Sequence, residues 1–583
     1  MDLTDIESLS AALASGRTTA TKVVEAVMDA IELSNRPEAW LHVVERASLL
    51  ARAEELERIG PRALPLYGIP FAVKDNIDVA GIPTTAGCPA YAYTPDRTAT
   101  AVDCLLAAGA ILVGKTHMDQ FATGLVGTRS PHGPCRNAHV SQYIAGGSSS
   151  GSAVVVAQGI VSFALGTDTA GSGRVPAVLN GVVGVKPSRG LISTDGVVPA
   201  CASLDCVSVF ARGCADAERV LAVLEAKKTQ PAALPTRRRS SSFVFGVPAA
   251  AELTSLDGEA HDLFAKAVAA LTRAGGTCVE IDYAPFRETA DLLYGRGAWL
   301  VERDRSFGTF LRAHPEAVDP TVAAIVAEAA GITSAQIDAS LQRLVQQKTA
   351  TQPILDDIDV LVVPTVPQLF TIADVLARPL EASPKMGVFN NFVNLLGLAA
   401  VAVPTNAWSC GVPFGITLCA PGGSDALLLE IGAALESRVA SEVPRLRRPH
   451  RIAIAVVGAH LSGMPLHHQL TERGARLVAV TRTSADYRLF ALPDTLPPKP
   501  GLQRVSENGA AIEVEVWSLT PQAFGSFVAA VPRPLAIGRL TLEDGSEVSG
   551  FVCEPQALRG ALDITDYGGW RAYMTGAGAA AAR

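Results

Sequence analysis

The chain contains the stretch Gly146-Gly147-Ser148-Ser149-Ser150-Gly151-Ser152, followed by the turn Thr167-Asp168-Thr169-Ala170-Gly171-Ser172-Gly173-Arg174. Ser148 and Ser172 lie 24 residues apart, and far upstream Lys74 ends an apolar run that begins at Gly68. A serine hydroxyl becomes a good nucleophile when a nearby base removes its proton. Flanking glycines let backbone N–H groups approach a substrate carbonyl. Two serines and a lysine therefore indicate a hydrolytic site that needs no histidine.

The composition is typical of a globular enzyme. The chain has 583 residues, which predicts at least two domains, and a formal net charge of −8, which argues against a nucleic-acid surface. The longest apolar runs are too short to span a bilayer, and the acidic N-terminus is not a secretory signal. The ten cysteines form no C-x-x-C pair. We therefore expect free thiols in a reducing compartment, no metal site, no membrane partner and a cytoplasmic location.

Strand and helix patterns alternate through the first part of the chain. The expected elements are strands at 71–74, 110–113 and 163–166 and helices at 100–108 and 152–158. This alternation predicts an α/β architecture in which helices cover the faces of a sheet.

The pattern changes after a proline- and arginine-rich segment near residue 445. Residues 452–457 read as a buried strand, and residues 512–517 alternate polar and apolar side chains as a half-buried strand does. The expected organisation is a large domain at 1–443, a linker at 444–450, a smaller α+β domain at 451–574 and a disordered Ala/Gly-rich tail at 575–583.

A second interpretation of the serine-rich stretch stays open. Residues 147–151 also satisfy G-x-S-x-G, the nucleophile elbow of the α/β-hydrolases. Ser149 would then be the nucleophile, with an acidic residue and a histidine following downstream. Residues 140–145, which would have to form the preceding strand, have a weak strand pattern.

Several segments together resemble the amidase signature family of serine hydrolases. The resemblance runs through 70–76, 114–121, 146–152, 167–174 and 184–187. It implies a large domain with a mixed sheet flanked by helices, and a site without cofactor or metal. The implied catalytic residues are Lys74, a bridging Ser148 in a cis-peptide turn, and the nucleophile Ser172. The implied oxyanion hole consists of the backbone N–H groups of Thr169, Ala170 and Gly171.

Lys74 can accept a proton only when its amine is uncharged. A free lysine has a pKa of about 10.4, so roughly one molecule in 2,500 is neutral at pH 7. Burial among the apolar residues 69–73 would lower that pKa by roughly 3 units, because desolvation disfavours the ammonium.

The C-terminal region narrows the resemblance to one branch of the family. The segments 457–463, 499–502, 513–517 and 550–554 are similar to the C-terminal domain of allophanate hydrolases. This resemblance implies hydrolysis of allophanate, releasing ammonia and ultimately carbon dioxide, after a separate biotin-dependent urea carboxylase has acted. It also implies a homodimer.

The anionic end of such a substrate calls for an arginine, because a guanidinium can hold both carboxylate oxygens. The resemblance makes Tyr294, Arg303 and Gly124 the candidates for substrate binding, with Arg296 or Arg305 as alternatives to Arg303. In the smaller domain, His460 is the candidate for assisting decarboxylation of the first product, and His467 and His468 are weaker candidates.

Two other functions stay open at this point. The chain could be a broad-specificity amidase, or the component that supplies ammonia to glutamyl-tRNA, although the second would not carry the C-terminal domain. Residues 451–574 could also be a non-catalytic module for dimerisation or docking.

Overall fold

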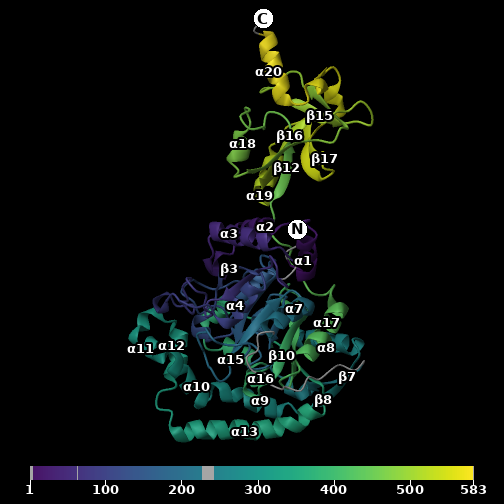
Figure 1. The fold of residues 1–583 in the computed structure, drawn as a ribbon. Helices are drawn as coiled ribbons and strands as arrows, with labels where there is room; N and C mark the ends of the chain where they lie inside the picture. The colour runs from purple at the N-terminus through teal and green to yellow at the C-terminus, as the bar shows by residue number, and fades with distance from the viewer. Residues whose placement is uncertain (1–3, 62–63, 226–241, 582–583) are drawn as a thin grey trace. The chain divides into compact units, whose positions relative to one another are not determined.

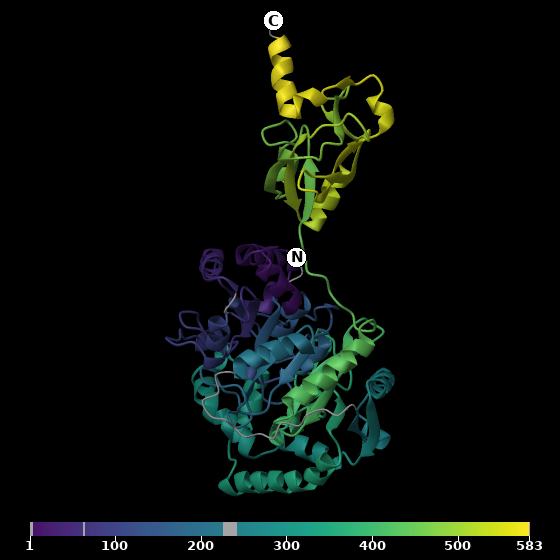
Figure 2. The same ribbon diagram turned by 45° about the vertical axis from the view of Figure 1, so that its right-hand side comes forward.

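The computed structural model describes residues 4–61, 64–225 and 242–581 (Figures 1 and 2). The chain divides into two compact units, Met1–Arg448 and Pro449–Arg583. The division falls inside the segment 444–450 that the sequence marks as a linker.

The first unit is built on an eleven-stranded mixed sheet with the order β1-β3-β2-β4-β6-β5-β10-β11-β9-β7-β8. β2 is parallel to β3 and β4, and β7 is parallel to β8 and β9, whereas the remaining pairs are antiparallel. The mixed sheet expected from the sequence is confirmed. Its strands are β1 (Trp40–Val43), β2 (Pro70–Lys74), β3 (Ile111–Thr116), β4 (Phe163–Asp168), β5 (Val183–Lys186), β6 (Cys206–Ala211), β7 (Phe243–Pro248), β8 (Gly276–Ile281), β9 (Val360–Pro364), β10 (Ala399–Ala407) and β11 (Pro413–Ala420).

Helices cover both faces of this sheet (Figure 1). α17 packs on the face of β10 that carries Val401 and Val403, because a Cβ at Gly432 would touch both side chains. α6 packs on the other face, where Ala402 pairs with Gly184 and a Cβ at Gly184 would touch Ala177. The helices are α1 (Ile6–Ala14), α2 (Ala20–Ser34), α3 (Arg46–Ile59), α4 (Thr100–Ala107), α5 (Ser150–Ala157), α6 (Val175–Leu179), α7 (Cys214–Glu225), α8 (Gly258–Arg273), α9 (Ala284–Asp291), α10 (Ala298–Arg303), α11 (Thr309–Ala313), α12 (Pro320–Ala327), α13 (Ser334–Asp356), α14 (Ile372–Ala377), α15 (Ala382–Gly387), α16 (Asn391–Leu395) and α17 (Asp425–Val439).

Two parallel central strands position the candidate site. Every residue of β2 and of β4 is buried, as expected for strands covered on both faces. Val73 pairs with Leu165, so the carboxyl ends of the two strands lie side by side. Lys74 therefore reaches the same edge of the sheet as Thr167, just before the turn that carries Ser172.

The second unit is an α+β domain with its own core, as expected from the alternating pattern. A five-stranded sheet has the order β13-β16-β12-β18-β17, and a three-stranded sheet has the order β15-β14-β19. The elements are β12 (Ile452–Val456), β13 (Arg476–Arg482), β14 (Tyr487–Ala491), β15 (Pro500–Arg504), β16 (Glu513–Leu519), β17 (Leu535–Thr541), β18 (Glu547–Cys553), β19 (Leu562–Asp563), α18 (His468–Thr471), α19 (Pro521–Ala529) and α20 (Trp570–Ala581).

The C-terminal tail differs from the expectation. We expected disorder over 575–583, but α20 continues to Ala581. Alanine has the highest helix propensity, so a run of alanines extends a helix that begins in the packed part of the domain. Within 4–61, 64–225 and 242–581, every helix is too short or too polar to cross a lipid bilayer.

Candidate active site

Lys74 is a buried amine surrounded by hydroxyl groups. Its Nζ donates to Ser148 Oγ at 2.7 Å and to Thr167 Oγ1 at 2.7 Å, and the side chain is 0% exposed. Burial lowers the pKa of Lys74 to about 7, although the negative charges of Asp119, Asp205 and Asp168 act in the opposite direction. A large fraction of this amine is therefore neutral near physiological pH and can accept a proton.

Ser148 lies in a turn that Asp119 holds in place. The Gly147–Ser148 peptide bond is cis, and the Ser148 carbonyl accepts from the Asp119 backbone N–H at 3.2 Å. A Cβ at Gly147 would collide with the Asp119 carboxylate, so only glycine fits there. The same carboxylate accepts the N–H groups of Val126, Gly127 and Arg129 at 3.2, 3.0 and 3.0 Å. Asp119 thus joins the serine turn to the loop 126–129.

Ser172 lies in the turn between β4 and α6, and Asp168 organises this turn. The Asp168 carboxylate accepts the N–H groups of Gly171 and Gly173 at 2.8 and 3.0 Å. It also accepts two hydrogen bonds from the Arg174 guanidinium, at 2.9 and 3.0 Å. Ser172 itself is only 2% exposed. A carboxylate thus holds the backbone on both sides of the candidate nucleophile.

The Asp168–Arg174 pair is completely buried and continues into α16. Arg174 donates to the backbone carbonyl of Asn390 at 3.1 Å and to Asn394 Oδ1 at 2.9 Å. The Asn394 amide returns a hydrogen bond to the Asp168 carbonyl at 2.9 Å. Buried charges are tolerated when all of them are paired in this way, and such a network leaves the turn little freedom to move.

The three backbone N–H groups predicted to form the oxyanion hole differ in their hydrogen bonding. The Gly171 N–H donates to Asp168 Oδ1, so in this conformation it does not face a substrate. No hydrogen bond from the N–H of Thr169 or Ala170 to another described residue is present, and these two donors remain the candidates. Thr169 is anchored by its side chain, whose hydroxyl donates to Asp205 at 2.5 Å. Burial raises the pKa of Asp205 to about 6.

Arg303 is the buried arginine of the three candidates. It ends α10, is 1% exposed, and its Nε and Nη1 have no hydrogen-bond partner among the described residues. Its guanidinium carbon lies 5.4 Å from the centre of the Tyr294 ring, in cation–π range. Ala170, two residues before Ser172, shares an apolar cluster with Leu293 and Trp299. The segment 292–303 therefore lies against the Ser172 turn and places there a buried guanidinium, two of whose nitrogens have no hydrogen-bond partner among the described residues.

The other candidate residues lie in different surroundings. Arg296 is on the surface, where it pairs with Glu328 at 3.3 Å, and Arg305 is exposed. Gly124 has a φ of 153°, and a Cβ there would lie 2.8 Å from the Asp119 carboxylate and 3.1 Å from Arg129 Nη1. Gly124 thus belongs to the loop that Asp119 organises.

The nucleophile-elbow interpretation is wrong. Ser149 is fully buried, and its hydroxyl donates to the backbone carbonyl of Thr167 at 3.1 Å. Residues 140–145 form isolated bridges instead of the strand that an elbow follows. Ser149 therefore fixes α5 to β4.

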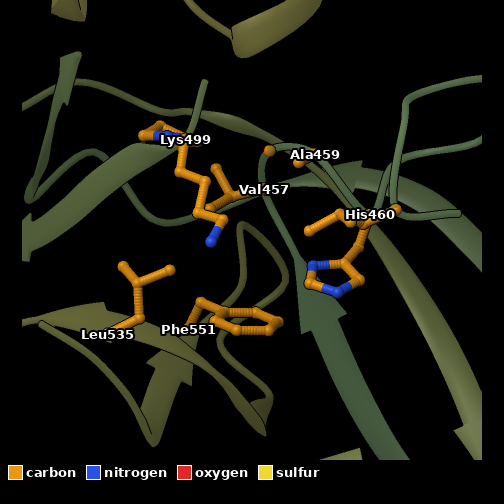
Figure 3. A pocket seen from close by; sticks show the side chains of 9 residues that line it. Val457, Ala459, His460, Lys499, Leu535 and Phe551 are labelled. Atoms are coloured by element: carbon orange, nitrogen blue, oxygen red, sulfur yellow. The ribbon is translucent and has the colours of Figure 1, made fainter. Parts of the chain in front are cut away.

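The second unit has a pocket of its own around His460 (Figure 3). His460 Nε2 lies 3.0 Å from Gln469 Oε1, and its ring stacks on Phe551 at 5.1 Å with an interplanar angle of 17°. Burial lowers the pKa of His460. Lys499, Leu535 and Phe551 line the same pocket, which opens into a cavity of about 250 Å³.

Sequence reasoning missed several residues that hold the site. Asp168 and Arg174 stand inside the quoted turn, and their opposite charges among glycines were a usable signal. Thr167 was also in that turn, but only the structure shows that it contacts Lys74. Asp119 and Asp205 act from other segments, and nothing local marks them.

Comparisons with known proteins identify families for both units. A family model described as Amidase matches residues 22–429, and one described as Allophanate hydrolase C-terminal domain matches residues 452–575. Urea amidolyase of Saccharomyces cerevisiae is 42% identical over 593 residues, which cover 95% of this chain and 32% of that protein. The chain thus spans about a third of the length of that relative.

Two further proteins are similar to this chain, one over most of its length and the other over nearly all of it. Indoleacetamide hydrolase of Pseudomonas savastanoi is 30% identical over 450 residues, which cover 75% of this chain and 96% of that enzyme. The structure of Kluyveromyces lactis allophanate hydrolase superimposes with a TM-score of 0.68 at 38% identity, covering 96% of this chain and 97% of that one. The chain therefore belongs to the amidase family, and its second unit is an allophanate hydrolase C-terminal domain.

Proposed function

We propose that this chain hydrolyses allophanate, with Ser172 as nucleophile, Ser148 as proton relay and Lys74 as base. The observation that carries the proposal is the buried Lys74 amine, bonded at 2.7 Å to the serine of a cis-peptide turn. Its pKa of about 7 keeps a large fraction of the amine uncharged at neutral pH, and only the uncharged amine can accept the proton of a serine. The similarity to allophanate hydrolase over nearly both whole chains supports the choice of substrate.

The first step is acyl transfer. Ser172 Oγ attacks the terminal amide carbonyl of allophanate while its proton passes to Ser148, and the proton of Ser148 passes to Lys74. The oxyanion forms beside the N–H groups of Thr169 and Ala170. When the C–N bond breaks, the proton returns from Lys74 through Ser148 to the leaving nitrogen, and ammonia departs. Water then hydrolyses the acyl-enzyme by the same relay. The product is a dicarboxylate in which one nitrogen bears both carboxylate groups.

Arg303 would hold the carboxylate of the substrate. Its guanidinium is buried and lacks partners among the described residues for two of its nitrogens, so a carboxylate there would accept the missing hydrogen bonds. Tyr294 packs against this guanidinium and fixes its direction. Gly124 would contribute through the backbone of the Asp119 loop.

The second unit would act on the product of the first. Loss of carbon dioxide from the dicarboxylate needs a proton on its nitrogen, and His460 lines a pocket suited to deliver it. A chain with this activity would follow a biotin-dependent urea carboxylase, and we propose that it works as a homodimer.

The test is ammonia release by the purified protein from a panel of allophanate, malonamate, glutamine and aliphatic amides. Allophanate should be turned over with the highest kcat/KM. Comparable values for aliphatic amides would favour the broad-specificity amidase instead. Glutamine as the preferred substrate would contradict both.

A further inference from the structure

Among the described residues, the pocket of the second unit is lined by one lysine, Lys499, and by no acidic side chain. Lys499 is the only lysine between residues 449 and 583. Its ammonium and a ring nitrogen of His460 turn toward the same space above the Phe551 ring (Figure 3). Apart from His460, Lys499 and Gln469, side chains without charge or hydrogen-bonding groups line the pocket and the cavity behind it.

The contact with Gln469 fixes the tautomer of the neutral His460 ring. The Gln469 Oε1 oxygen can only accept, so the His460 Nε2 that lies 3.0 Å from it bears the proton. Nδ1 is then the nitrogen left for a ligand. The face of the ring stacks on Phe551 and its edge meets Phe527, so the ring cannot turn without losing both contacts.

We propose that Lys499 is the carboxylate-binding residue of the second unit and that Gln469 is the positioning residue for His460. This inference rests on the proposed function, since the ligand is the dicarboxylate that hydrolysis of allophanate releases. Lys499 binds one carboxylate as a point charge. The other carboxylate lies toward the apolar wall formed by Leu535, Phe551 and Val457.

Loss of carbon dioxide from the dicarboxylate consumes one proton. Protonated His460 donates from Nδ1 to the nitrogen of the dicarboxylate, the C–N bond to the outer carboxylate breaks, and its electron pair stays on nitrogen. The outer carboxylate leaves as neutral carbon dioxide, and carbamate remains. His460 regains its proton from water. The apolar wall favours this direction, because it solvates carbon dioxide better than a carboxylate.

Burial lowers the pKa of His460, so the imidazolium needs a stabilising charge from the ligand. A dianion beside the ring favours the imidazolium. Lys499 limits this effect by neutralising one of the two charges, and it binds a carboxylate more strongly than a neutral amide. The pair therefore selects a doubly charged ligand.

The experiment follows ¹³C-labelled allophanate by NMR with full-length protein at about pH 9, where uncatalysed loss of carbon dioxide from carbamates is slow. The variants are Lys499→Met and Lys499→Arg, with Arg559→Met as the control that removes an exposed cation of the same unit. Lys499→Met should release the first ammonia at the wild-type rate and prolong the dicarboxylate signal by about tenfold to a hundredfold. Lys499→Arg should restore most of the clearance, and Arg559→Met should match wild type.

Gln469 is tested in the same assay by rescue. Gln469→Leu should slow clearance of the dicarboxylate, whereas Gln469→Glu, which keeps an acceptor oxygen for Nε2, should recover it. Equal clearance by wild type and a folded Lys499→Met would overturn the inference while leaving the first step intact. Absence of the first ammonia from wild type would refute the proposed function itself. An unchanged melting temperature shows that each variant is folded, and if Lys499→Met does not fold, Lys499→Gln takes its place with the same two outcomes.

Discussion

Replacing Lys74 by methionine should make the stability of the protein less dependent on pH. The folded protein holds Lys74 with a pKa of about 7, whereas the ordinary lysine value of 10.5 applies to the unfolded chain. Between these values the unfolded state binds about one proton more, so the free energy of unfolding of wild type rises with pH in this window. The slope for one proton is about 1.4 kcal/mol per pH unit. Lys74→Met lacks this contribution.

The measurement is chemical denaturation of both proteins at about pH 7.5, 8.5 and 9.5. Methionine also loses the hydrogen bonds to Ser148 and Thr167, which cost about 1 kcal/mol each, but that cost does not vary with pH. The stability of Lys74→Met minus that of wild type should therefore fall by about 1.4 kcal/mol for each pH unit. If the two stabilities change in parallel, the buried amine keeps its proton in the folded state, and the proposed base cannot work.

Four further outcomes test the site. Ser172→Ala should abolish ammonia release from allophanate with an unchanged melting temperature. For wild type, kcat/KM should fall about tenfold per pH unit below the Lys74 pKa of about 7, because the protonated amine cannot accept a proton; a flat profile contradicts this. Arg303→Met should lower kcat/KM about a hundredfold, which is about 2.7 kcal/mol, while Arg305→Met on the exposed side should not. Asp168→Asn should cost about 3–5 kcal/mol of unfolding free energy, because Arg174 stays buried without its partner, and a loss under about 1 kcal/mol would contradict the network.

Local sequence was sufficient to pick out the glycine-rich turns at Ser148 and Ser172 and the buried strand that ends at Lys74. Glycines beside serines mark a backbone that must approach a ligand, and the apolar run ending at Lys74 marks a buried strand. The α/β architecture followed from the alternation of strands and helices, and the mixed sheet followed from the resemblance to the amidase signature family. These features depend on a few consecutive residues, which a single sequence displays.

The choice among the arginines could not be made in this way. Arg296 and Arg303 are seven residues apart and would share a face of one continuous helix. The chain, however, leaves helical geometry between Leu292–Tyr294 and α10, and a π-helical turn starts at Asp304. These breaks set which arginine is buried. The engagement of the Gly171 N–H by Asp168 and the support from Asn390, 216 residues beyond Arg174, likewise depend on tertiary structure.

Lys74 forms no ion pair with a carboxylate in the described part of the chain, and the surrounding residues explain why. Lys115 pairs with Asp75 at 3.2 Å, on the strand beside β2, and is fully buried as well. Lys74 instead contacts two hydroxyls. The carboxylates nearest to it are already occupied: Asp119 by backbone N–H groups, Asp168 by Arg174 and Asp205 by Thr169. Because each acid is bonded elsewhere, its charge reaches Lys74 only at a distance, and desolvation prevails. Asp119, Asp168 and Asp205 thus leave the Lys74 amine without an ion pair, which is the condition that the proposed base requires.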